Sequence, residues 1–191
     1  MSQMLFSHDT ELTLRAACVL VNSNRCTGAP GTDALGSQSD LERYLECFRW
    51  TGRRDRDTAE LEAVHLLRDR LGAVWAAADT EEVAVCRVNT LLADTRAAPW
   101  LTRHPEMPEW HLHLAAGDDP LAQRMGAEMA MALADLIRAG ELRRLKSCAA
   151  PGCPAVLIDL SRNRSRMFCD TGNCGNRLHV AAYRERRARE H

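Results

Sequence analysis

The chain has 191 residues, of which 46% are hydrophobic and 27% are charged, with 25 Lys and Arg against 26 Asp and Glu. This composition is typical of a folded globular protein with a medium-sized core, and it excludes a disordered chain. The N-terminal stretch MSQMLFSHDTE lacks the basic and apolar segments of a secretion signal, and no apolar run is long enough to span a bilayer. We therefore expect a cytoplasmic protein without a membrane segment.

Hydrophobic periodicity predicts a mainly helical N-terminal domain that covers residues 1–140. Asp57-Thr58-Ala59-Glu60 predicts a capping box, and Asp118-Asp119-Pro120 predicts an acidic helix start followed by Pro at the first helical position. The expected helices lie within Thr10–Asn22, from Asp40 to Trp50, from Asp57 through residue 78, from Thr80 through Leu92, and from Asp118 to Arg138.

Between residues 97 and 117, three prolines break the helical pattern, and EWHLHLAA alternates apolar residues with His111 and His113. This alternation predicts a strand in a small β-hairpin, with both histidines on one face. With His65 and His104 they are candidates for a second metal site or an acid–base site. No carboxylate partner is evident in the sequence, so a polar strand face is the simpler interpretation.

Charge is distributed unevenly along the chain. Residues 1–140 contain 14 basic and 21 acidic residues, whereas residues 141–191 contain 11 basic and 5 acidic residues. An acidic helical domain followed by a basic tail predicts two modules with different partners, divided between residues 140 and 141.

Four cysteines in the tail are regularly spaced, as CAAPGC and CDTGNC, with four residues inside each pair and fifteen between the pairs. In a reducing cytoplasm such a quartet indicates a metal site rather than two disulfides. One structural zinc is therefore predicted, and a catalytic zinc is not, because four thiolates leave no open coordination position. An iron–sulfur cluster is the chemical alternative. The predicted ligands are Cys148, Cys153, Cys169 and Cys174.

The sequence around the quartet predicts a small treble-clef-like finger. Two tight knuckles, with Gly152 and Gly172 in their turns, are joined by a hairpin of AVLID and RMFC, and a basic helix follows Cys174. The helix N-terminus would stabilise the Cys174 thiolate. A module of this size needs its metal in order to fold. We also expect Asp159 and Arg177 to pair inside the finger.

The segment CAAPGCPAVLIDLSRNRSRMFCDTGNCGNR resembles the CGNR zinc finger, which is named for the tetrapeptide at residues 174–177. In that family the finger follows an ABATE domain of stress-induced transcription regulators, and TELTLRAACVLVNS and EWHLHL are similar to the start and the late strand of that domain. The resemblance implies a bacterial transcription regulator that binds double-stranded DNA through the finger. Its N-terminal domain would sense a small-molecule effector or form a homodimer.

The composition of the basic tail agrees with DNA binding. Arginine neutralises phosphates, while Arg and Asn can also read guanine and adenine edges. The residues expected to contact phosphates are Arg162, Arg164 and Arg166 in the hairpin turn and Arg184, Arg186 and Arg187 late in the helix. The residues expected to contact base edges are Asn176, Arg177 and His179 at the helix start.

Two alternative functions stay open at this point. A basic helix also suits an acidic protein face, so the finger could be a zinc-stapled protein interaction module without DNA binding. The sequence contains no nucleotide-binding loop or triad pattern, so we expect no enzymatic activity. An enzyme would require a pocket in residues 1–140 where the histidines meet carboxylates.

Overall fold

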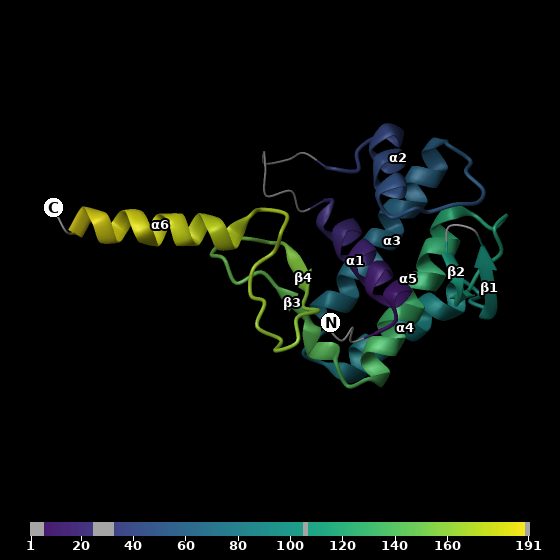
Figure 1. Ribbon diagram of the computed structural model, residues 1–191. Helices are drawn as coiled ribbons and strands as arrows, with labels where there is room; N and C mark the ends of the chain where they lie inside the picture. The colour runs from purple at the N-terminus through teal and green to yellow at the C-terminus, as the bar shows by residue number, and fades with distance from the viewer. Residues whose placement is uncertain (1–5, 25–32, 105–106, 190–191) are drawn as a thin grey trace.

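The computed structural model describes residues 6–24, 33–104 and 107–189. Within these ranges the chain is mainly helical, with a small hairpin ahead of the cysteine-rich region, as the sequence predicts (Figure 1). The helices are α1 (His8–Asn22), α2 (Gln38–Cys47), α3 (Thr58–Ala76), α4 (Glu81–Asp94), α5 (Leu121–Arg138) and α6 (Cys174–Arg189), with a short 3-10 turn at Leu142–Arg144. The strands are β1 (Trp100–His104), β2 (Met107–His113), β3 (Leu145–Ser147) and β4 (Val156–Ile158).

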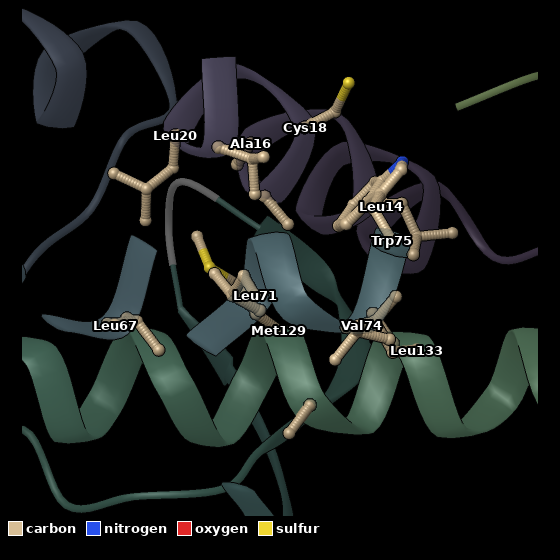
Figure 2. Packing of buried hydrophobic residues seen from close by; sticks show 14 of the residues in the cluster. Leu14, Ala16, Cys18, Leu20, Leu67, Leu71, Val74, Trp75, Met129 and Leu133 are labelled. Carbon is tan, nitrogen blue, oxygen red and sulfur yellow. The ribbon is translucent and has the colours of Figure 1, made fainter. Parts of the chain in front are cut away.

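The main core lies between α1, α3 and α5, with α4 packed against α3 and α5. Helix α1 contributes Leu14 and Leu20, α3 contributes Leu71 and Val74, and α5 contributes Met129, all of them fully buried (Figure 2). Leu71 and Val74, three residues apart, lie on one face of α3, and burying such apolar stripes is what holds amphipathic helices together.

The helix starts follow local capping chemistry. Asp57 caps α3 as predicted, because its carboxylate accepts the N–H of Glu60 at 2.8 Å. The carboxylate of Glu60, which the predicted capping box would direct to Asp57, instead accepts the N–H groups of Asp55 and Arg56. The predicted start of α2 at Asp40 is wrong: the helix begins at Gln38, because the hydroxyl of Ser37 accepts the N–H of Asp40 and takes the cap position.

Strand β4 is shared between the helical core and the cysteine cluster. Because successive strand residues point to opposite faces, Val156 and Ile158 pack in the main core. Ala155 and Leu157 pack with the cysteines on the other face. The short run AVLI is therefore buried on both sides.

The predicted hairpin of AVLID with RMFC is wrong. Strand β4 pairs antiparallel with β3, so that Leu145 lies opposite Ile158, and residues 166–169 form no strand. One backbone hydrogen bond, from the N–H of Ala149 to the carbonyl of Met167 at 2.8 Å, and several side chains bind the returning backbone in place of a strand ladder. Asp159 accepts the N–H of Arg166 at 2.9 Å, and the ammonium of Lys146 donates to the carbonyls of Arg164 and Arg166.

Side chains of α1 and α3 also bond the backbone of β4. The amide of Asn22 donates to the carbonyl of Val156 at 2.9 Å and accepts the N–H of Val156 at 2.8 Å. It therefore satisfies both backbone groups as a neighbouring strand would. The indole N–H of Trp75 donates to the carbonyl of Leu157 at 3.1 Å. The hairpin β3–β4, which we call the finger root, is thus bonded to the helical body.

Candidate metal centre and nucleic-acid interface

The four cysteine sulfurs converge at the boundary between the finger root and α6. All four Sγ atoms lie within 4.8 Å of one another. Cys153 lies 3.7 Å from Cys169 and 3.6 Å from Cys174, and Cys169 lies 3.7 Å from Cys174. Tetrahedral zinc with bonds of about 2.3 Å places neighbouring sulfurs about 3.8 Å apart, whereas a disulfide requires about 2.05 Å. The four cysteines are positioned to bind one metal ion, and their geometry fits one structural zinc.

The pKa values of the cysteine thiols shift in different directions within the quartet. Burial and the neighbouring thiols raise the pKa of Cys174 to about 12 and also raise that of Cys169. Burial opposes the ionisation of Cys148 as well, but the N–H groups of Cys169 and Ala150 outweigh it and lower the pKa of Cys148 to about 7. The helix N-terminus at Cys174 therefore does not by itself produce a thiolate there. A bound zinc ion deprotonates its cysteine ligands and balances their charge.

Each cysteine pair closes around a residue with left-handed backbone. In the first knuckle this residue is Gly152, with φ of +69°, as predicted. In the second it is Asn173, with φ of +47°, rather than the predicted Gly172. Asn tolerates this conformation better than most residues. The N–H of Cys169 points at the sulfur of Cys148, 3.4 Å away, and links the two knuckles.

The predicted pairing of Asp159 with Arg177 is wrong. Asp159 is fully buried and bonds the ammonium of Lys146 at 2.6 Å. Burial disfavours its charge, but Lys146 and the donors of Ser161 and Arg166 outweigh burial and lower the pKa of Asp159 to about 2. Four donors occupy its two oxygens, which leaves no place for Arg177. Nothing in the sequence distinguished Lys146 as its partner except that it is the single lysine of the chain.

The three arginines after β4 differ in their surroundings. Arg162 is exposed. Arg164 forms a bidentate ion pair with Glu141, with N–O distances of 2.9 and 2.6 Å, and thereby joins this loop to the end of α5. Arg166 pairs with Asp170 and donates to the carbonyl of Phe168. Arg162 is the one of the three whose side chain makes no ion pair among the described residues.

Beyond its first turn, α6 projects away from the rest of the molecule (Figure 1). At 3.6 residues per turn, all candidate DNA-contacting residues of the helix fall on one half of its circumference. All of them are exposed: Asn176, Arg177, His179, Arg184, Arg186 and Arg187. Among residues 174–187 the opposite half contains Gly175, Leu178, Ala181, Ala182 and Glu185, and Gly175 lies against the ring of Phe168.

The histidines singled out in the sequence are only partly brought together. His111 and His113 meet on β2, with their Nε2 atoms 3.2 Å apart. His65 lies elsewhere, with its ring bonded to the carbonyl of Leu35, and the side chain of His104 lies outside the described part of the structure. A shallow hollow of about 670 Å³ runs along α4 and is lined by Glu81, Glu82, Val85, Cys86, Asn89, Thr90, Ala93 and Asp94. It contains carboxylates but none of these histidines.

Sequence reasoning missed the residues that join the finger to the body. Asn22 and Trp75 lie far from the cysteines in the sequence, yet each bonds a residue of the finger. Glu141 lies seven residues before Cys148 and bonds Arg164. The sequence signal for Asn22 was a polar residue at the end of an apolar helix stripe, and this pattern alone does not name a partner.

These features define a helical protein that carries a four-cysteine zinc finger at its C-terminal end. The model of the CGNR zinc finger family matches residues 144–187, and the model of the ABATE family, described as "Putative stress-induced transcription regulator", matches residues 14–140. The second match covers most of the chain, so the protein belongs to the ABATE family and combines its domain with a CGNR zinc finger.

No match was found among the curated proteins. The two matching families are of zinc-finger and regulator type and are not enzyme families. Among the described residues, no helix has the length and apolar character that crossing a membrane requires.

Proposed function

We propose that this protein is a transcription regulator that binds duplex DNA through the basic half of α6. In this proposal residues 141–191 form the DNA-contacting unit, and residues 1–140 form the unit that senses an effector or dimerises. The observation that carries the proposal is a helix with six exposed candidate residues on one half, projecting free of the body and held at its first turn by the metal cysteines. A 16-residue helix is about 24 Å long, and the major groove admits an α-helix.

The positions of these residues around α6 suggest which of them would contact bases and which would contact phosphates. This assignment differs in part from the one expected from the sequence. The centre line of the basic half runs through Asn176, Val180, Tyr183 and Arg187. Val180 and Tyr183 are 39% and 53% exposed, so both side chains are accessible to a partner. In the groove this line would face base edges, with Asn176 reading adenine and Val180 contacting a thymine methyl.

The flanks of the same half would contact the two phosphate walls. Arg177 and Arg184 lie seven residues apart on one flank, and His179 and Arg186 lie seven apart on the other. Arg162 adds a cation beside the finger. Arg164 and Arg166 already form ion pairs within the finger, so we assign them weaker phosphate contacts than Arg162.

The metal would have a structural role only. Zinc bound by four thiolates has no open position for chemistry, and it would fix the direction in which α6 leaves the body. The chain's own residues then supply the contacts, since phosphate contacts orient a protein on DNA and base contacts specify the sequence.

The test is binding of the zinc-loaded protein to fragments of its own genome, followed by anisotropy titrations on a selected and a random duplex. Arg162→Ala should weaken binding to both duplexes and reduce the salt slope by about one. Asn176→Ala should weaken binding to the selected duplex alone, by about 1–3 kcal/mol. Arg138→Ala, on the body and paired with Asp135, is the matched control and should change neither.

One observation favours a second function. The exposed Val180 and Tyr183 among arginines would also suit an acidic protein groove that accepts a helix. If the zinc-loaded protein binds no duplex at low salt, the DNA-binding proposal is wrong and this interaction module takes its place.

A further inference from the structure

The β1–β2 hairpin lies at the opposite end of the molecule from α6 (Figure 1) and contains a pair of converging histidines. His111 and His113 are two residues apart on β2, so their side chains leave the same face of the strand. Their ring centroids are 5.0 Å apart, and their Nε2 atoms are 3.2 Å apart. Two imidazole ligands on one tetrahedral zinc, with bonds of about 2.0–2.1 Å, have their nitrogens about 3.3 Å apart.

Hydrogen bonding fixes the ring of His111 in the orientation of a metal ligand. Its Nδ1–H donates to the carbonyl of Glu109 at 2.9 Å, so in the neutral ring Nε2 carries the lone pair. A backbone carbonyl on the second ring nitrogen is the usual support of a metal-binding histidine, because it sets the tautomer and the ring plane.

The ring of His113 is positioned by an aromatic neighbour on the adjacent strand. Trp100 lies opposite His113 in the register of the hairpin, and its ring meets the imidazole edge-on with centroids 6.0 Å apart. His111 is buried and His113 is half-buried, so both rings are held while one stays accessible from solvent.

We propose that His111 and His113 are two ligands of a second, exchangeable site for a first-row transition metal ion such as Ni²⁺, Cu²⁺ or Zn²⁺. Imidazole nitrogen suits these ions, whereas Mg²⁺ and Ca²⁺ prefer oxygen. In the metal-free protein the Nε2–H of His113 donates to Nε2 of His111. On binding, that proton moves to Nδ1 of His113, and both Nε2 lone pairs face the ion. With two protein ligands, this site binds more weakly than the four-thiolate site.

The experiment is a titration of the full-length, zinc-loaded protein with Ni²⁺, followed by calorimetry and by tryptophan fluorescence. Trp100 touches His113, so a bound paramagnetic ion should quench part of the emission. We expect one Ni²⁺ per chain beyond the structural zinc. Absence of the thiolate-to-nickel charge-transfer absorption shows that the added ion is not at the cysteines.

The double variant His111→Ala/His113→Ala should lose this equivalent of Ni²⁺ and the quenching, while its zinc content stays at one per chain. His113→Asn, which leaves the buried ring of His111 in place, should do the same and keeps the test valid if the double variant does not fold. The matched control His65→Gln, whose ring bonds the carbonyl of Leu35, should bind Ni²⁺ as the wild type does. If the wild type takes up no additional ion, or the variants still do, the contact is only a hydrogen bond between two imidazoles and the proposal is wrong.

Discussion

The finger root and helix α6 are parts of the same zinc finger, yet they differ in almost every physical respect. The side chains of Val156 and Ile158 lie in the main core, and Asn22 satisfies both backbone groups of Val156. Helix α6 is exposed along most of its length and, beyond its first turn, projects away from the rest of the molecule (Figure 1). The metal cysteines lie between these two parts. The contrast indicates that the finger root serves the fold and that α6 is free to bind a partner.

The largest effect that separates the two parts should follow removal of the metal. Structural zinc supplies about 10–16 kcal/mol in small fingers, and Cys174→Ser removes one ligand. We expect loss of the metal and melting of α6, measured by elemental analysis and hydrogen exchange. The amides of Val156–Ile158 should stay protected, because the body holds them. Cys86→Ser, an exposed cysteine on α4, is the control. Equal rates of amide hydrogen exchange in β4 and α6 of the variant would contradict this prediction.

A smaller loss should follow from cutting the bond between the body and the finger root. Asn22→Ala leaves the N–H and carbonyl of Val156 without their partner, at about 1–3 kcal/mol for each buried group. We therefore expect the free energy of unfolding to fall by about 2–4 kcal/mol in urea titrations, with zinc content unchanged. Asn89→Ala, on the exposed side of α4, should have almost no effect. An equally small effect for Asn22→Ala would show that the body does not hold β4.

The ion pair between Asp159 and Lys146 should contribute a comparable amount to the free energy of unfolding, and this contribution should depend on pH. The pKa of Asp159 falls from 3.8 to about 2 on folding, so its charge stabilises the protein above the unfolded pKa by about 2 kcal/mol. This contribution is lost as the pH falls toward 2. Asp159→Asn should therefore cost about 2 kcal/mol, constant between pH 8 and pH 6, in denaturant titrations of the zinc-loaded proteins. A cost that varies across this range would mean that another group titrates with it.

The smallest effect on stability is expected on α6 itself. Arg184 and Arg187 are exposed. Substitutions of surface residues that take no part in the core, in helix caps or in buried hydrogen bonds usually change stability by about 0.5 kcal/mol or less. Arg184→Ala should leave the melting temperature and zinc content unchanged while weakening DNA binding on every sequence. A clear loss of thermal stability would show that α6 has a structural role, which its contacts in this structure do not indicate.

The sequence predicted the parts of the molecule that depend on local chemistry. Periodicity located the helices, Asp57 was recognised as a cap, and the spacing of Cys148, Cys153, Cys169 and Cys174 predicted the convergence of their sulfurs. Each of these depends on neighbours in sequence or on a ligand set whose geometry a metal dictates.

The errors concern contacts between distant segments. The spacing of AVLID and RMFC allowed them to pair. However, β3 directly precedes the first cysteine knuckle, as β4 directly follows it, so β3 can pair with β4 across that knuckle. Asp159 had several basic residues within reach, and burial selected Lys146, which also binds two backbone carbonyls. A sequence pattern shows that a charge needs a partner. The packing of the fold decides which partner it receives.

The most direct test of the account is the salt dependence of DNA binding by the full-length, zinc-loaded chain. The wild type should be compared with a variant in which Arg177, Arg184 and Arg186, the arginines on the two flanks of α6, are replaced by Gln. We expect the slope of log K against log salt to become less steep by about 2.7, because each lost phosphate contact removes about 0.9. Zinc content and melting temperature should not change. An unchanged slope in a folded variant would contradict the assignment of α6 as the DNA-contacting part of the finger.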